Sequence, residues 1–213
     1  MARMRIYKTA FVALTLALAA AAAIPAHANL LIDGGFEQPA IADGSFATLT
    51  AIPGWIGAPT IEVQNHVAGT PYEGNQYVEL DTDGNSSMYQ DFATAIGATY
   101  RIQFQYSPRP GVSAASNGLA FLWDDSPYAM MALSGIDLAD TVWSGYDMTA
   151  VATSSLSRVS FTAFGISDSR GGYIDNVRVT AVPEPGVLPL FGLGLAILAT
   201  RLRTRRRTPF SAV

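Results

Sequence analysis

The chain of 213 residues contains no cysteine and only two histidines. Without cysteine it has no disulfide framework, no thiolate zinc site and no cysteine nucleophile. We expect His27 to be removed with a leader segment, which leaves His66 alone. The sequence also has no Ser-His-Asp set, zinc-protease motif, phosphate-binding loop or dinucleotide fingerprint. We therefore predict a protein that is not an enzyme and whose core is held by packing.

Positive charge is scarce in the middle of the chain. Residues 29–182 contain 5 of the 13 basic and 16 of the 17 acidic residues, which gives this stretch a formal charge of −11. Such a domain repels the phosphates of nucleic acids, so we expect no nucleic-acid partner. Its many carboxylates are compatible with calcium binding.

The first 28 residues have the features of a secretory signal peptide. A basic start over residues 1–8 precedes an apolar run over residues 10–24, and small residues follow at Ala26 and Ala28. Small side chains at these two positions form a signal-peptidase site, so we expect cleavage after Ala28. The alternative, a membrane anchor, is disfavoured because the apolar run is short.

The other end of the chain, residues 182–207, also combines three features in a fixed order. Pro183, Glu184 and Pro185 precede an apolar run over residues 187–200. That run is short for a helix that needs about 20 residues to cross the hydrocarbon core. An arginine cluster follows, which would keep its end in the cytoplasm: Arg201, Arg203, Arg205, Arg206 and Arg207. We expect residues 208–213 to form a disordered tail.

This order resembles the PEP-CTERM sorting signal of Gram-negative bacteria that make exopolysaccharide and biofilm. The resemblance implies that an exosortase, a membrane cysteine protease-transpeptidase, recognises Pro183-Glu184-Pro185 and removes the tail. The apolar helix would then anchor the protein in the inner membrane transiently, before release to the cell surface or the extracellular matrix. The alternative is a proline-rich linker before a permanent anchor.

Residues 29–181 contain short segments rich in aromatic and β-branched residues, separated by turn residues. In residues 100–106 apolar and polar side chains alternate, as is typical of an antiparallel strand with one buried face. We predict an all-β fold, an antiparallel β-sandwich or jelly roll. The expected strands are residues 30–32, 60–63, 76–80, 87–92, 100–106, 118–123, 143–151, 159–163 and 172–179.

Four motifs in this region occur in a familiar order: residues 29–37, 52–55, 76–81 and 171–179. Together they resemble the galactose-binding-like jelly roll of many carbohydrate-binding modules and related exported bacterial domains. The resemblance implies the fold. It does not fix the function, because the same frame serves sugar binding, adhesion and architecture.

The same resemblance implies a structural Ca²⁺ where the first and last strands meet, with Glu37 and Asp175 at the family's acidic positions. The opening motif departs from the family's Asn-Gly-x-Phe-Glu, because Asp33 stands at the position of the asparagine. Asp175 shares strand parity with Val177 and Val179, so we expect it to point with the apolar set. A carboxylate placed there needs a cation or several hydrogen-bond donors. The alternative to Ca²⁺ is a set of backbone amides at a β-bulge.

A saccharide site would combine an aromatic platform with charged or amide groups. The loop of residues 107–117 lies between two strong strands, where binding sites are often found. The candidate ligand-binding residues are Arg109, Asn117, Trp123 and Tyr128. Further candidates are Tyr72, Asp124, Asp125 and Trp143, whereas Trp55 is expected to fill the core.

Three functions remain open at this point. The leading one is a non-catalytic, exosortase-sorted protein of the cell envelope or biofilm matrix. The second is a dedicated carbohydrate-binding module for exopolysaccharide. The third is a glycoside hydrolase, although no spacing among the acids of the domain singles out a catalytic pair.

Overall fold

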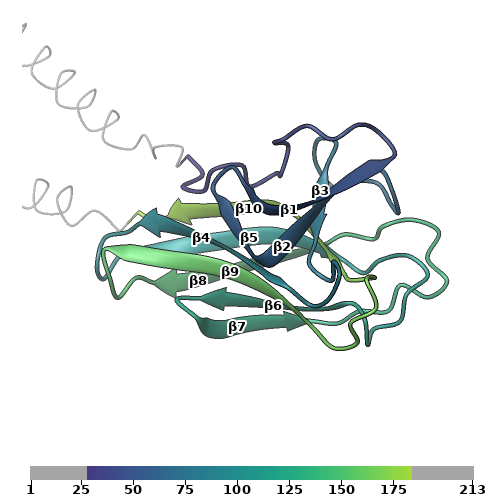
Figure 1. Ribbon diagram of the computed structural model, residues 1–213. Coiled ribbons are helices and arrows are strands. Elements are labelled where there is room, and N and C mark those ends of the chain that lie inside the picture. The colour runs from purple at the N-terminus through teal and green to yellow at the C-terminus, as the bar shows by residue number, and fades with distance from the viewer. Residues whose placement is uncertain (1–27, 184–213) are drawn as a thin grey trace, which may run out of the picture. The chain divides into compact units, whose positions relative to one another are not determined.

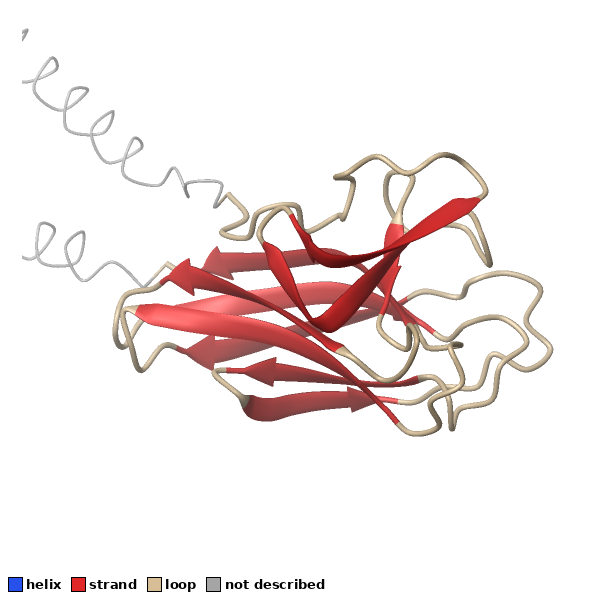
Figure 2. Cartoon of the chain, in the orientation of Figure 1, coloured by secondary structure: helices blue, strands red, loops and turns tan. Residues whose placement is uncertain are grey.

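Ten strands and no helix make up residues 28–183, the part of the chain that the computed structural model describes (Figures 1 and 2). The strands are β1 (Ser45–Ile52), β2 (Trp55–Asn65), β3 (Tyr77–Glu79), β4 (Ser87–Ala93), β5 (Thr99–Ser107), β6 (Gly118–Trp123), β7 (Ser126–Met131), β8 (Ser144–Val151), β9 (Leu156–Phe164) and β10 (Tyr173–Ala181). This confirms the predicted all-β class.

Several sequence predictions lie outside the described residues. They are Ala26, Glu184, Pro185, the apolar run and the arginine cluster. Within residues 28–183, the structure contains no helix long and apolar enough to span a membrane.

All strand pairings are antiparallel, in the order β7-β6-β9-β4-β2-β3-β10-β5-β8, with β1 paired to β2 beside this path. The sheet curls, so that β5 packs on β6 and β9 (Figure 1). The ring of Phe104 on β5 lies 5.4 Å from Phe121 and 5.0 Å from Phe161, between ring centroids. The hydrophobic core fills the space between the two halves of the curled sheet.

Alternation on β5 follows the sequence prediction. Tyr100, Ile102, Phe104 and Tyr106 are buried, while the residues between them point away from the core. Trp55 is also fully buried, with Phe36 and Phe161 at ring-centroid distances of 5.5 and 6.3 Å. Its expected role as a core residue is therefore confirmed.

Eight of the nine predicted strands overlap an observed strand, but residues 30–32 form bends instead. This segment is held from two sides, because Leu30 N–H donates to the carbonyl of Val179 and Ile32 N–H donates to the side chain of Gln90. The sequence analysis also missed β1 and β7. β1 has few buried residues, and β7 contains Pro127, which lacks the N–H that a regular strand uses.

A β-bulge in β10 overturns the expected orientation of Asp175. The register with β5 shifts between Asp175 and Arg178, and Asn176 has a φ of 50°. Ile174, Val177 and Val179 consequently enter the core, whereas Asp175 points to the opposite face. The extra residue changes the parity, which a strict period of two could not anticipate.

The connections gather at two ends of the sandwich. Long loops (residues 66–76, 108–117, 132–143 and 165–172) form what we call the loop end, at the right of Figure 1. Short turns (residues 53–54, 94–98, 124–125 and 152–155) form the turn end.

Candidate functional site

A second buried layer lies on the face of the sheet that points away from the hydrophobic core. On β2, β3 and β10, polar and tyrosine side chains alternate with the core residues, yet they have no exposed surface. We call this set the outer polar layer: Gln64, Tyr77, Glu79, Tyr173 and Asp175. Loop-end segments pack against it, since backbone N–H groups of residues 72, 73 and 171 donate to its carboxylates.

Strand register aligns this layer with exposed side chains on β1. Thr48 lies opposite Glu62, and Glu62 lies opposite Glu79 on the next strand. In the neighbouring row, Phe46 lies opposite Gln64. Directly opposed residues of an antiparallel pair share a face of the sheet. The layer therefore continues from its buried centre to an open margin, where the side chain of Phe46 is 58% exposed.

Glu79 and Arg109 form an ion pair at the centre of the layer. Arg109 NH1 donates to Glu79 Oε2 at 2.7 Å, and Gln64 Nε2 donates to the same oxygen at 2.7 Å. Gly171 N–H donates to the other carboxylate oxygen. Burial raises the pKa of Glu79 to about 8, although Arg109 and the Gly171 amide both lower it. Burial thus opposes the charged carboxylate of this ion pair, while Arg109 and the Gly171 amide stabilise it.

Aromatic rings surround this ion pair. The guanidinium of Arg109 lies 5.9 Å from the ring centroid of Tyr173, and the rings of Tyr77 and Tyr173 are 4.6 Å apart. The hydroxyl of Tyr173 is buried and has no hydrogen-bond partner among the described residues.

Two further aromatic residues lead from this layer to the surface. Trp143 packs edge-on against Tyr77 at 6.1 Å and against Tyr72 at 6.3 Å. Its indole N–H donates to the carbonyl of Thr70 at 2.9 Å, which fixes the ring against the loop of residues 66–76. Tyr72 is half-exposed. The loop end thus carries accessible aromatic surface next to the buried tyrosines.

Glu37 and Asp175, the predicted calcium residues, both hold the loop of residues 66–76. Asp175 accepts the N–H groups of Tyr72 and Glu73 at 2.9 and 3.0 Å. Glu37 accepts those of Asn75 and Gln76 at 2.8 and 3.1 Å. Backbone amides at a bulge were the alternative to Ca²⁺, and Asp175 has these contacts.

Burial raises the pKa of Asp175 to about 7, against the lowering effect of its amide donors. Among residues 28–183 no group of three or more histidine and acidic side chains is arranged to hold a metal ion. Calcium binding stays a prediction.

The structure does not bring the four predicted ligand-binding residues together. Arg109 and Asn117 lie at the loop end, while Trp123 and Tyr128 lie on β6 and β7 toward the turn end. The six residues of β6 separate Asn117 from Asp124, about 20 Å at the rise of an extended strand. Groups at the loop end and groups at the turn end therefore cannot belong to one site.

Two of the four are also buried, which corrects the expectation that they reach a ligand. Asn117 accepts the Arg109 N–H at 2.9 Å and donates to the carbonyls of Val112 and Ser113, so it braces its own loop. Trp123 packs in the core against Phe92 and Tyr100. Arg109 and Tyr128 keep exposed surface, with the Arg109 side chain 20% exposed.

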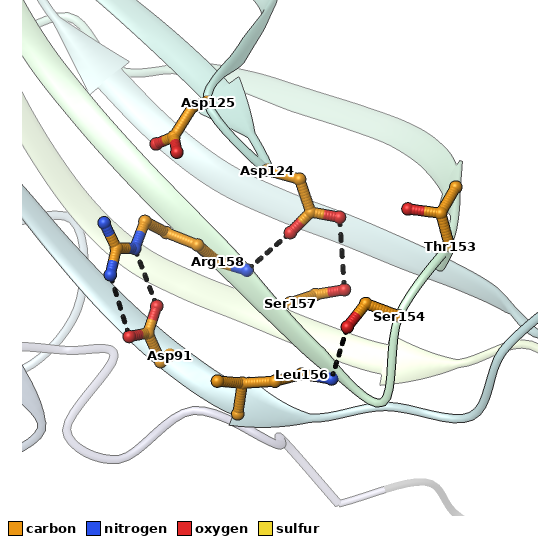
Figure 3. A pocket seen from close by; sticks show the side chains of 8 residues that line it. All are labelled: Asp91, Asp124, Asp125, Thr153, Ser154, Leu156, Ser157 and Arg158. Carbon is orange, nitrogen blue, oxygen red and sulfur yellow. Dashed lines mark hydrogen bonds and ion pairs between the residues drawn. The ribbon is translucent and has the colours of Figure 1, made fainter.

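A cavity of about 310 Å³ lies at the turn end (Figure 3). Most of its charged groups are paired with each other. Arg158 donates two hydrogen bonds to Asp91, and Asp124 accepts the backbone N–H of Arg158 and the hydroxyl of Ser157. Asp124 and Asp125, which the sequence analysis associated with Arg109, thus belong to a separate cavity.

Sequence reasoning missed the acidic and tyrosine side chains at the centre of the layer. Residues 60–64 and 76–81 alternate polar and apolar side chains, which predicts one wet face on each strand. The structure instead buries Gln64, Tyr77 and Glu79 of that face under the loop end. The sequence did contain a signal for this cluster, because two glutamates, a glutamine and a tyrosine lie on the same face of two neighbouring strands.

Two bacterial toxins contain a segment similar in sequence to this chain. No protein-family model matches the chain. The chain is 28% identical over 158 residues to a multifunctional-autoprocessing repeats-in-toxin of Vibrio cholerae, covering 72% of this chain and 3% of that protein. The corresponding toxin of Vibrio vulnificus is 28% identical over 154 residues, with 70% and 3% covered. The chain therefore spans only a small part of these relatives.

Among solved structures, a Stig cyclase from Fischerella sp. TAU aligns with a TM-score of 0.53 and 17% identity, covering 73% of this chain and 97% of that one. A family 16 carbohydrate-binding module aligns with a TM-score of 0.47 and 15% identity, covering 71% and 99%. A family 61 module solved with β-1,4-galactotriose gives 0.47 and 16%, covering 73% and 99%. The described region is a curled antiparallel β-sandwich, similar in fold to the Stig cyclase.

Proposed function

We propose that the β-sandwich is a carbohydrate-binding module of an exported, non-catalytic protein of the cell envelope or biofilm matrix. The saccharide would bind where the outer polar layer reaches the surface, between Arg109, Glu62 and Phe46. The observation that carries this proposal is Arg109, a partly exposed cation fixed over the ring of Tyr173 by a carboxylate with no exposed surface.

The donors and acceptors at this margin suit sugar hydroxyls. A guanidinium has five N–H donors in a planar fork. Within residues 28–183, Arg109 uses its NH1 for Glu79 and for the carbonyl of Ser169, while its Nε and NH2 donate to no protein group. Glu62 is partly exposed and supplies an acceptor. Binding sites place a few such polar groups beside apolar and aromatic surface.

Exposed aromatic side chains flank these polar groups on two sides. Phe46 lies one strand away from Gln64, and Tyr72 lies beyond Trp143 and Tyr77. Neighbouring strands are about 4.8 Å apart, so the step from Glu79 on β3 to Thr48 on β1 is about 10 Å. A short oligosaccharide lying across the strands would contact both the polar centre and Phe46.

One observation bears on the glycoside hydrolase alternative. Gln64 Nε2 donates to both Glu62 and Glu79 at 2.7 Å, so the two acceptor oxygens are no more than twice 2.7 Å apart. Retaining glycosidases hold their carboxyl groups about 5–5.5 Å apart. However, the side chain of Glu79 is 0% exposed and cannot contact a glycosidic oxygen, so we assign it no catalytic role.

Titration of the purified protein with exopolysaccharide from its own bacterium tests the binding proposal. Arg109→Lys keeps the charge beside Glu79 but loses the planar fork, and Phe46→Ala removes only exposed aromatic surface. We expect at least tenfold weaker binding for each by calorimetry. Arg101→Ala, which removes an exposed arginine paired with Asp147, should leave binding unchanged. No binding by the parent protein, or equal binding by all variants, would overturn the proposal.

We further propose that the protein is exported after cleavage behind Ala28 and sorted by an exosortase at Pro183-Glu184-Pro185. Two features support this. The sequence places the motif, the apolar run and the arginines in the required order. The Val182 N–H donates to the carbonyl of Thr99 at 2.8 Å, so the folded domain extends to the residue before the motif.

Processing in the native host tests this second proposal. Glu184→Ala should leave the tail attached and the protein in the inner membrane, as detected by mass spectrometry of membrane and released fractions. Asp43→Ala, in an exposed turn before β1, is the matched control. Normal processing of Glu184→Ala would contradict recognition of this motif. A tail that stays attached in the parent protein as well would favour the alternative of a permanent anchor behind a linker.

Structural Ca²⁺ remains part of the proposal for Glu37 and Asp175. Both carboxylates converge on residues 72–76, where they accept backbone N–H groups. Melting temperatures measured with Ca²⁺ and with a chelator decide the point. A higher melting temperature with Ca²⁺ supports the site, and equal temperatures remove it.

A further inference from the structure

Three strands of the described sheet have a neighbour on one side only: β1, β7 and β8. Such edges expose unpaired N–H and C=O groups, and proteins usually protect them with charge, proline or bulges. β7 contains Pro127 and a bulge in its pairing with β6. β8 carries Asp147, which pairs with Arg101. These two edges are protected in the expected way.

β1 has no such protection. Its eight residues, Ser45 to Ile52, include no charged residue, no proline and no glycine. The irregularity in its pairing with β2 lies on the partner strand, because Leu49 pairs with Ile61 and Ala51 with Ile56. Residues 57–60 of β2 account for the difference, and β1 remains a regular strand. An uncharged, regular edge strand is a ready template for strand addition.

The side chains of β1 also alternate in a regular way. Phe46, Thr48 and Thr50 are exposed, whereas Ala47 and Leu49 are partly buried and Leu49 packs against the hydrophobic core. Any strand that adds to this edge must present apolar side chains on the core face and an aromatic or β-branched set on the outer face. It must also carry no charge of its own where it meets Phe46.

We propose that β1 pairs with β1 of a second copy of this chain, antiparallel, about a two-fold axis at Thr48. In this register Thr48 lies opposite Thr48 of the second copy, Phe46 opposite its Thr50, and Ala47 opposite its Leu49. Aromatic–β-branched pairs and threonine pairs are favourable across antiparallel strands. Opposed residues have the same parity along the two strands, so the outward hydrogen-bonding groups of the two strands match.

A second β1 meets these requirements, because it carries no charge and has the same alternation of side chains. The stretch of residues 29–182 has a formal charge of −11, so two copies repel each other over most of their surfaces. This repulsion opposes association and is screened by salt, whereas β1 itself adds no carboxylate to the contact. Because Thr48 lies opposite Glu62 on β2, the pairing also joins the outer faces of the two sheets into one.

A single cysteine tests the proposed register, because the chain contains none of its own. Directly opposed Cβ atoms across antiparallel strands lie about 4.5–5.5 Å apart, close to the 3.5–4.5 Å of a disulfide. Under mild oxidation of the purified protein, Thr48→Cys should form a covalent dimer at least tenfold faster than Thr149→Cys on the edge strand β8. Equal rates for the two variants would overturn the proposal.

Mass measurement of the unlinked protein is the second test. By light scattering over a dilution series, the parent protein should reach twice the mass of Thr48→Lys, which places a charge at the two-fold axis. Thr149→Lys, on β8, should behave as the parent does. Circular dichroism shows that each variant is folded. If the parent protein has the mass of Thr48→Lys at every concentration, pairing with a second copy is contradicted. This holds also if the parent protein then binds a different strand at this edge.

Discussion

Arg109 NH1 lies 2.7 Å from Oε2 of Glu79, which joins the loop of residues 108–117 to a fully buried carboxylate on β3. A loop residue and a sheet residue 30 positions apart are thereby held in one geometry. Removal of one partner from such a pair leaves the other charge buried without compensation, which costs more than the pair itself contributes. The relationship therefore predicts an asymmetric response to mutation.

Arg109→Ala should lower the free energy of unfolding by about 3 kcal/mol, because Glu79 then lacks its cation. The double variant Glu79→Gln/Arg109→Ala removes both charges and should recover more than half of that loss. Urea unfolding followed by tryptophan fluorescence measures both values. Additive losses in the two single variants and the double variant would show that the residues are not coupled.

Asp175→Asn should remove part of the pH dependence of stability. Burial raises the pKa of Asp175 to about 7, from an ordinary 3.8. Between these values the folded protein retains a proton that the unfolded chain has lost. Stability contributed by this group is therefore complete below about pH 4 and falls as pH rises to about 7. One such group gives a slope of at most about 1.4 kcal/mol per pH unit.

The measurement is the free energy of unfolding of both proteins across this pH window. The parent curve should fall more steeply than that of Asp175→Asn, whose amide has no titration. Asp147→Asn is a suitable control, since its exposed carboxylate has a lowered pKa through hydrogen bonding to Arg101. Parallel curves for the parent and Asp175→Asn would show that Asp175 does not cause this pH dependence of stability.

The sequence predicted most strands because their side chains alternate and their ends carry turn residues. Residues 118–123 were predicted with the observed bounds of β6. The orientation of Asp175 could not be predicted, because one residue in a bulge changes the parity of everything after it. β1 was missed because its side chains are mostly exposed and leave little hydrophobic pattern.

The candidate site was only partly predictable for a related reason. Arg109 could be named because two prolines hold it in a loop between strong strands. Glu79 could not, since its parity places it on a face that alternation alone describes as solvent-exposed. What buries that face is a set of loops distant in sequence, such as residues 66–76 and 165–172, and their packing is a tertiary effect. Chemistry-bearing residues were therefore found less readily than strands.

Gly135→Ala should disturb the candidate binding site, although Gly135 is not itself a ligand-binding residue. A Cβ at this position would lie 2.0 Å from the carbonyl oxygen of Arg109, which belongs to the backbone and cannot rotate away. Gly135 also exchanges backbone hydrogen bonds of 2.8 Å with Gly111 and Val112. We expect a loss of at least about 1 kcal/mol in unfolding free energy, as for other strained sites, together with weaker saccharide binding.

Gly97→Ala is the contrasting variant. It lies at the turn end, and a Cβ there meets no atom within 4 Å, although its φ of 84° carries its own strain. Its effect should appear in urea unfolding alone, with saccharide affinity unchanged in calorimetry. If Gly135→Ala and Gly97→Ala affect binding equally, the geometry of the Arg109 loop does not determine affinity.

Tyr173→Phe separates a structural role of the buried hydroxyl from a role in binding. The hydroxyl of Tyr173 has no partner among the described residues, so its removal should leave stability unchanged or raise it slightly. Tyr106→Phe is the matched control, because the Tyr106 hydroxyl donates to the carbonyl of Asn117 at 2.8 Å and accepts the N–H of Leu133 at 3.1 Å. Its loss should cost about 1–3 kcal/mol.

Both variants should keep the saccharide affinity of the parent once they are folded. The Tyr173 side chain is 0% exposed, so a saccharide bound at the margin does not contact its hydroxyl. Tyr106, which faces the hydrophobic core, should affect binding only through stability. Urea unfolding and calorimetry on the same preparations distinguish these outcomes. Unchanged affinity of Tyr173→Phe would show that the ligand stays at the margin formed by Arg109, Glu62 and Phe46 and does not reach the buried tyrosine.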